Sequence, residues 1–193
     1  MIHHCKIVGV LSLQGDFTDH LRSLSQHKVQ GVEVRTKANL ARVDALILPG
    51  GESTVIAKLL VSTGLDKAIV QRAKEGMPIW GTCAGAILLA KEVISPVPLE
   101  TTLSLVPVEI ERNAYGRQSE SFQTELKIGE ELTSVFFIRA PKIVKVGRGV
   151  KVLAECKGDP VMVKFKNILI TTFHSELGYP NKILEYFLSI GEA

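Results

Sequence analysis

The sequence contains little cysteine, since the 193-residue chain has only Cys5, Cys83 and Cys156. An odd number without close spacing excludes a disulfide-stapled secreted fold and a zinc site built on paired cysteines. We therefore expect reduced thiols and a cytoplasmic protein. His3 and His4 precede Cys5, but no further ligand lies near them in the sequence. We expect residues 1–5 to form a flexible tail, and no bound metal.

Long apolar runs are missing as well. The apolar stretch at 7–13 is interrupted by Gly9 and Ser12, and no small-residue cleavage site follows it, which argues against a signal peptide. No segment approaches the roughly 20 apolar residues that a membrane-spanning helix needs. We therefore expect a soluble protein without a membrane partner.

An excess of charge of one sign is also absent, because 23 basic and 20 acidic side chains give a formal net charge of +3. This balance excludes the basic footprint of a nucleic-acid-binding or anionic-membrane-binding protein. The densest basic stretch alternates with valines around Gly147 and Gly149, which predicts the solvated side of two strands rather than a phosphate-binding patch. Its basic residues are Lys142, Lys145, Arg148 and Lys151.

The sequence does contain a large apolar fraction, 46% of its residues, which is enough for the core of one domain. We expect a single domain over residues 1–193. The first half alternates short apolar runs with segments of helical periodicity. Expected strands lie at 6–13, 32–35, 44–51 and 77–82, and expected helices at 16–29, 53–61, 65–75 and 84–93.

The second half changes character, because strand-like segments follow one another with little helix between them. These segments lie at 105–111, 121–128, 134–138, 150–156, 160–165 and 167–173, and a helix is expected at 181–190. The alternation in the first half predicts a doubly wound α/β domain. We expect a three-layer sandwich whose central sheet is mostly parallel, with antiparallel additions in the C-terminal half.

The chemistry of the chain is indicated first by Cys83, which lies between Gly81 and Gly85 in a Gly-x-Cys-x-Gly pattern. This is the thiol form of a nucleophile elbow, in which a strand turns sharply into a helix and presents the nucleophile above the sheet. The glycines permit the strained turn, and the helix N-terminus favours the thiolate. The free N–H group of Ala84 is a candidate donor to an oxyanion.

A thiol nucleophile needs a base, and His174 is the candidate among the five histidines. It closes the last expected strand, and Glu176 lies two positions further on. Because residues i and i+2 of a strand point the same way, the carboxylate can orient the imidazole as the third member of a triad. Alone, His-x-Glu also fits a surface histidine beside an acid. An elbow cysteine in the same chain favours the catalytic interpretation.

A second glycine turn, Pro-Gly-Gly-Glu-Ser-Thr at 49–54, follows another expected buried strand. Two glycines can turn a backbone N–H group into the cleft and so supply a second oxyanion donor. Ser53 or Thr54 is the expected cap of the helix that follows. In open α/β sheets, ligands lie at the carboxyl ends of the strands, where this turn and the elbow are both expected.

Together, six motifs resemble the glutaminase subunits of pyridoxal 5′-phosphate synthase, a family of triad glutamine amidotransferases. The motifs are LQGDF at 13–17, LPGGEST at 48–54, GTCAG at 81–85, ERNAYGRQ at 111–118, FIRAP at 137–141 and FHSEL at 173–177. The likeness spans residues 6–188. It implies the flavodoxin-like sandwich of class I amidotransferases and a reaction without a cofactor.

The resemblance implies that Cys83 attacks the side-chain amide of glutamine, that His174 transfers the protons, and that Glu176 orients His174. A glutamyl thioester forms and is hydrolysed to glutamate. Backbone near Gly51 and Ala84 is expected to hold the oxyanion. The positions expected to hold glutamine are Gly51, Glu52, Ser53, Arg112, Ile138 and Arg139. Without the resemblance, the two arginines would be interpreted as surface ion-pair residues.

The resemblance also implies a protein partner. Family members dock on a barrel-shaped synthase subunit in a large hetero-oligomer, and ammonia passes through that subunit to pentose and triose phosphates. Gln14, at the end of the first expected strand, is expected at this interface. Docking is expected to complete the oxyanion hole at the Gly50-Gly51 turn, as a conformational gate.

Some features depart from the family pattern or leave alternatives open. Ser175 stands where the family usually has proline, for which we expect at most a modest effect on rate, and Val55 replaces a usual threonine. One alternative is the glutaminase of histidine or guanine nucleotide synthesis, although the residues after the elbow, Gly85-Ala86-Ile87, do not match its usual pattern. A stand-alone cysteine hydrolase of the same fold and a catalytically silent docking module are the others.

Overall fold

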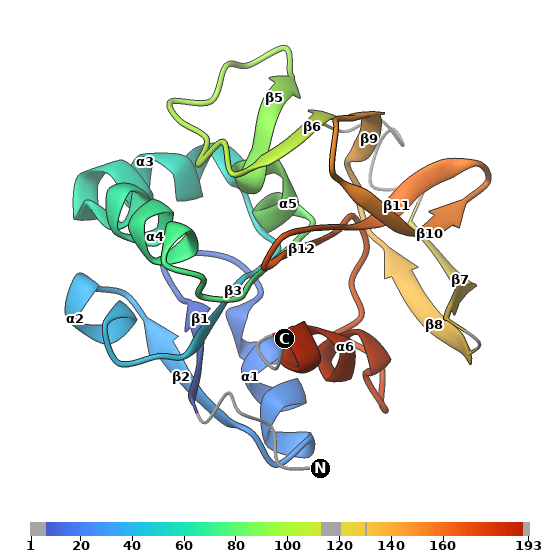
Figure 1. Ribbon diagram of the computed structural model, residues 1–193, viewed down its shortest axis with the longest axis horizontal. Coiled ribbons are helices and arrows are strands. Elements are labelled where there is room, and N and C mark those ends of the chain that lie inside the picture. Colours follow the sequence, from blue (N-terminus) through green and yellow to red (C-terminus); the bar gives the residue numbers. More distant parts are fainter. Residues whose placement is uncertain (1–6, 113–120, 130, 191–193) are drawn as a thin grey trace.

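A seven-stranded mixed sheet organises the molecule. The computed structural model describes residues 7–112, 121–129 and 131–190 (Figure 1). The strand order is β10-β11-β12-β4-β3-β1-β2. The parallel part comprises β1 (Ile7–Leu11), β2 (Gln30–Val34), β3 (Ala45–Leu48), β4 (Ile79–Thr82) and β12 (Ile168–Thr171). Antiparallel strands β10 (Lys151–Cys156) and β11 (Asp159–Phe165) extend one edge, which confirms the expected sheet.

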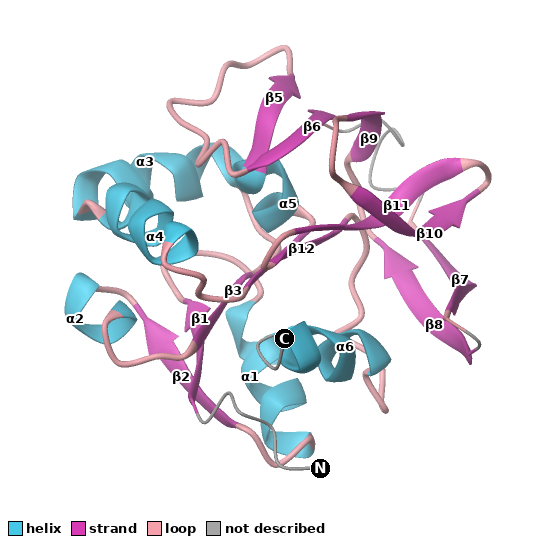
Figure 2. Cartoon of the chain, in the orientation of Figure 1, coloured by secondary structure: helices cyan, strands magenta, loops and turns pink. Residues whose placement is uncertain are grey.

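Helices cover both faces of this sheet and make the expected three layers (Figure 2). One face carries α3 (Ser53–Thr63), α4 (Leu65–Lys74) and α5 (Ala84–Leu89), and the other carries α1 (Phe17–Gln26) and α6 (Lys182–Ile190). Strand β3 shows why the central strands are apolar without interruption. Leu46 and Leu48 pack toward α3, α4 and α5, whereas Ala45 and Ile47 belong to the core beneath α1 and α6.

Two smaller sheets lie beside the central one. The first contains β5 (Ala90–Ile94), β6 (Val106–Glu111) and β9 (Lys142–Val146), and the second is the hairpin of β7 (Phe122–Ile128) and β8 (Glu131–Phe137). The basic stretch flanks the turn between β9 and β10, as expected. Lys145, Arg148 and Lys151 are exposed, and Lys142 forms an ion pair with Asp159 at 2.9 Å.

One expected element was wrong, because the helix predicted at 84–93 ends at Leu89 and the chain continues as β5. The carbonyl groups of Leu88 and Leu89 accept hydrogen bonds from the backbone N–H groups of Leu103 and Leu105, at 2.7 and 3.0 Å. These partners lie far along the chain, and β5 then pairs with β6. A short helix, α2 (Lys37–Leu40), was not expected and begins with a capping box between Thr36 and Asn39.

The topology brings four connections to the same edge of the sheet. Strands β12, β4, β3 and β1 are neighbours in that order and run parallel, so their carboxyl ends lie side by side. The segments that follow them contain His174, Cys83, Gly51 and Gln14. This is the edge at which open α/β sheets bind ligands. No helix in the described part of the chain has the length and apolarity to cross a membrane.

Candidate active site

Cys83 occupies a sharp turn between β4 and α5, with φ 51° and ψ −102°. Its backbone N–H group donates to the carbonyl of Thr171 at 2.9 Å, which ties the turn to β12. The flanking glycines are required sterically. A Cβ atom on Gly85 would lie 2.0 Å from the carbonyl oxygen of Leu48, and one on Gly81 would lie 2.7 Å from the backbone of Gly85. The segment therefore has the geometry of a nucleophile elbow.

His174 and Glu176 form a buried pair beside the elbow, and both are at most 6% exposed. The imidazole Nδ1 and the carboxylate Oε1 are 2.6 Å apart. Strand β12 ends at Thr171, so His174 lies beyond the strand in which it was expected. It is held instead by two backbone hydrogen bonds with Phe136, at 2.8 and 3.1 Å. An antiparallel bridge to β8 therefore fixes the backbone from which the imidazole projects.

The electrostatics of the pair favour two charged partners. Burial lowers the pKa of His174, but the hydrogen bonds with Cys83 and Glu176 outweigh it and raise the pKa to about 11. Burial raises the pKa of Glu176, but the nearby His20 and the hydrogen bond with His174 outweigh it and lower the pKa to about 2. The imidazolium thus lies between a carboxylate and the cysteine sulfur, where it can stabilise a thiolate and donate a proton.

The Gly50-Gly51 turn lies against the imidazole. A Cβ atom on Gly50 would come within 2.6 Å of Cε1 of His174, and Gly51 has φ +150°, which side chains rarely adopt. Gln14 reaches this turn from the end of β1, and its Oε1 accepts a hydrogen bond from the backbone N–H of Glu52 at 2.8 Å. The turn is therefore shaped by contacts from two separate segments.

The other side of the site is built around Arg112 and Glu52. One guanidinium nitrogen, Nη2, lies 3.1 Å from Oε1 of Glu52, and Nη1 donates to the hydroxyl of Ser95 at 3.1 Å. Glu52 also caps α3, because its side chain accepts from the N–H and hydroxyl groups of Thr54 at 3.3 and 2.8 Å. The expected cap, Ser53 or Thr54, was wrong, since both residues lie inside the first turn of the helix.

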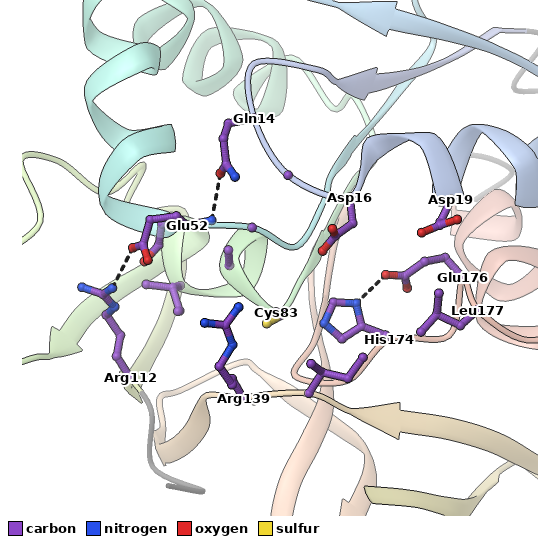
Figure 3. A pocket seen from close by; sticks show the side chains of 16 residues that line it. Gln14, Asp16, Asp19, Glu52, Cys83, Arg112, Arg139, His174, Glu176 and Leu177 are labelled. Atoms are coloured by element: carbon purple, nitrogen blue, oxygen red, sulfur yellow. Dashed lines mark hydrogen bonds and ion pairs between the residues drawn. The ribbon is translucent and has the colours of Figure 1, made fainter. Parts of the chain in front are cut away.

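A cavity of about 430 Å³ joins these groups (Figure 3). Figure 3 shows Arg112 and Arg139 on one side of Cys83, and His174 with Glu176 on the other. Arg139 has φ 46°, so its side chain leaves a strained backbone. The cavity is lined by Gln14, Gly15, Asp16, Asp19, Gly51, Glu52, Ser53, Cys83, Ala84, Ile87, Arg112, Ile138, Arg139, His174, Glu176 and Leu177.

Every residue predicted for the site from the sequence lies on this cavity. The sequence analysis did not assign Asp19, Ile87 or Leu177 to the site, and it considered Asp16 only as a helix cap. Asp16 does occupy the first position before α1, but its side chain makes no capping hydrogen bond. The motif residues 113–118 and the expected tail at 1–5 lie outside the described residues. Within the described ranges, no group of three potential metal ligands occurs.

The model of the SNO glutamine amidotransferase family matches residues 10–192. The chain belongs to this family. A relative from Pseudothermotoga lettingae, the pyridoxal 5′-phosphate synthase subunit PdxT, is 45% identical over 95% of this chain and 94% of its own length. The protein of the same name from Dehalococcoides mccartyi is 44% identical over 96% and 97%. A crystal structure described as a glutamine amidotransferase superposes with a TM-score of 0.91, at 42% identity over 96% of this chain and 99% of that one.

Proposed function

We propose that this chain hydrolyses the side-chain amide of L-glutamine and delivers the ammonia to a pyridoxal 5′-phosphate synthase subunit. The observation that carries the proposal is the position of Cys83, on an elbow beside the buried His174–Glu176 pair. The cavity at this elbow is rimmed by two guanidinium groups and has a volume suited to an amino acid. The names of the relatives, subunits of pyridoxal 5′-phosphate synthase, support the pathway.

The reaction follows from the three catalytic side chains. The Cys83 thiolate attacks the amide carbon of glutamine and forms a tetrahedral intermediate. The carbon–nitrogen bond then breaks, and the imidazolium of His174 protonates the nitrogen that leaves as ammonia. His174, now neutral, takes a proton from water, whose oxygen attacks the glutamyl thioester and releases glutamate with regeneration of the thiolate. Glu176 orients the imidazole and stabilises its charged form throughout.

The negative charge of the tetrahedral oxygen needs hydrogen-bond donors. Ala84 begins α5, so its N–H group has no acceptor within the helix and is available to the oxyanion. The second donor is the backbone at Gly51, across the cavity from Ala84. Because Gln14 contacts the adjacent N–H of Glu52, docking of a partner at Gln14 can adjust this turn. We therefore keep the expectation that the partner gates the oxyanion hole.

The substrate is held by its α-amino-acid end. The forked guanidinium of Arg112, together with Arg139, suits a carboxylate, whereas the carboxylate of Glu52 suits an ammonium group. Ser53 and Ile138 complete this part of the wall. Such an arrangement distinguishes an amino acid from a simple amide, and it points the side-chain amide toward Cys83.

The proposed biological setting is a single-domain subunit that docks, through the surface around Gln14, onto a synthase in the cytoplasm. Ammonia is mostly protonated in free water, so direct transfer to the partner keeps the reactive, neutral form. Cys83 and Cys156 are both free thiols, which is compatible with a reducing compartment.

Glutamate release from glutamine tests this function, with and without a pyridoxal 5′-phosphate synthase subunit. We expect release that the synthase stimulates and that Cys83→Ala abolishes. Cys156→Ala is the matched control, because it removes a second buried thiol from β10, away from the cavity, and we expect it to retain activity. Release that no synthase affects would instead indicate a different amidotransferase or a free hydrolase. Absence of release in the assembled complex would indicate a silent docking module.

A further inference from the structure

A second buried histidine, His20, lies behind the catalytic pair. It projects from α1 and is 1% exposed, although it does not line the cavity. Its Nε2 atom lies 3.5 Å from Oε1 of Glu176, the same oxygen that binds His174. Among the described residues, Nε2 of His20 and Oε2 of Glu176 are both buried without a hydrogen-bond partner. A small movement of either side chain would give the imidazole an acceptor and the carboxylate a second donor.

The surroundings hold the His20 ring against this carboxylate. The ring packs edge-on against Trp80, with 5.3 Å between centroids and an interplanar angle of 88°. Trp80 is itself fixed, because its indole N–H donates to the hydroxyl of Thr171 at 3.0 Å. Trp80 lies on β4, just before the elbow, and Thr171 ends β12, just before His174. His20 therefore links α1 to the two strands that deliver the nucleophile and the base.

The protonation of His20 decides what it can contribute. Burial lowers its pKa, and the proximity of His174 lowers it further, whereas the carboxylates of Glu176, Asp16 and Asp19 raise it less. His20 is therefore neutral near pH 7 and has one ring N–H group. Because an ionised carboxylate can only accept, the tautomer with the proton on Nε2 is the one that fits Glu176.

We propose that His20 is a positioning residue for glutamine hydrolysis: its neutral imidazole, packed between Trp80 and Glu176, holds the Glu176 carboxylate in the orientation that binds His174. This inference rests on the proposed function. Without His20, the carboxylate loses its second donor and rotates more freely, so its hydrogen bond with His174 weakens. The pKa of His174 then falls, and less of the imidazolium that protonates the leaving ammonia is present at alkaline pH.

Steady-state glutaminase kinetics in the complex with the synthase subunit test the proposal through two variants. His20→Phe keeps a ring against Trp80 but removes the donor, and we expect kcat to fall by about 10- to 100-fold with KM within about twofold. Its alkaline limb of kcat/KM should move to lower pH. His20→Gln returns an amide N–H group near the position of Nε2, and we expect it to restore kcat to within about threefold of wild type.

His27→Phe is the matched control on the same helix. His27 accepts a hydrogen bond from the backbone N–H of Asn181 at 3.3 Å and has no contact with the cavity. We expect this variant to lose stability while its kcat and pH profile stay unchanged. Should His20→Phe fail to fold, His20→Asn replaces it, since its shorter amide stops before Glu176 and should show the same loss of kcat.

A double-mutant cycle with Glu176→Gln separates positioning from a general effect on structure. If His20 acts through Glu176, then His20→Phe lowers kcat far less in the Glu176→Gln background than in wild type. Equal losses in both backgrounds, no recovery with glutamine, or an unchanged pH profile would each overturn the proposal.

Alkylation of Cys83 by iodoacetamide gives a readout that does not depend on glutaminase activity. We expect slower alkylation at pH 7 in His20→Phe and a rate close to wild type in His20→Gln, because the imidazolium of His174 supports the thiolate. If wild type released no glutamate, the proposed function would be wrong, but these alkylation rates would still decide the role of His20. Equal rates in all three proteins would overturn it.

Discussion

At the scale of single residues, Gly85 shows how little tolerance the elbow has. A methyl group there would meet the carbonyl oxygen of Leu48 at 2.0 Å, and neither backbone can move without displacing a strand end. We expect Gly85→Ala to cost about 3 kcal/mol or more of unfolding free energy and to remove most activity. Urea unfolding and glutamate release measure both quantities.

Gly178→Ala is the control for that substitution, because a Cβ atom there would have its nearest contacts at 3.7 Å. It should change the unfolding free energy by less than about 0.5 kcal/mol. Full activity in Gly85→Ala would contradict the requirement for a tight elbow.

Ser175, between the two catalytic residues, gives a second prediction at this scale. It is 2% exposed, and its hydroxyl has no hydrogen-bond partner among the described residues. We expect Ser175→Ala to be neutral or slightly stabilising, since it removes a buried polar atom without breaking a bond. Ser12→Ala, which breaks a 2.9 Å hydrogen bond to Val10, should cost about 1 kcal/mol. Thermal unfolding compares the two, and a lower Tm for Ser175→Ala would contradict the prediction.

At the scale of elements, the start of α3 combines a structural and a binding role in one side chain. Glu52 caps the helix and also holds Arg112 at 3.1 Å. We expect Glu52→Ala to lose about 1 kcal/mol of stability and to raise KM for glutamine by about tenfold, with less change in kcat. Urea unfolding and steady-state kinetics measure these effects.

Thr36→Ala is the matched control for the cap. It removes the capping box of α2 and should cost a similar amount of stability, but α2 does not line the cavity, so KM should not change. An unchanged KM in Glu52→Ala would leave that residue with the structural role alone.

The elements also show which structure a sequence can predict. The apolar strands and the glycine turns after β3 and β4 have local causes, so their positions followed from residue patterns. The end of α5 has a distant cause, namely the N–H groups of Leu103 and Leu105, and no local signal at Ala90 indicates it. The cap at Glu52 was missed for a related reason, because the adjacent Ser53 and Thr54 are the more usual capping residues.

At the scale of the whole molecule, the site is an outcome of strand order. Local patterns indicated a nucleophile, a base and a glycine turn, but only the neighbouring positions of β12, β4, β3 and β1 bring them together. The substrate-facing arginines were predicted through the family motifs, since nothing in their own surroundings distinguishes them from surface residues. His20 was not predicted, because its relation to Glu176 depends on the packing of α1 against the strands and has no signature in its sequence neighbours.

The buried charged pair should make the stability of the molecule depend on pH in a defined direction. The pKa of Glu176 falls from 4.5 to about 2 on folding, so its stabilisation is present above pH 4.5 and is lost as the pH falls toward 2. The pKa of His174 rises from 6.5 to about 11, so its stabilisation is present below pH 6.5 and is lost progressively toward pH 11. The pair therefore stabilises the fold fully between pH 4.5 and 6.5.

Urea unfolding of wild type and Glu176→Gln between pH 2 and 7 tests this dependence. We expect wild type to lose on the order of 3 kcal/mol more than the variant as the pH falls from 4.5 to 2, since only wild type must protonate this carboxylate. His20, whose pKa burial lowers, adds a loss below pH 6.5 in both proteins, so it does not account for the difference. A stability difference that stays constant with pH would mean that Glu176 is not held as a carboxylate, and the imidazolium of His174 would then lack the partner on which the reaction depends.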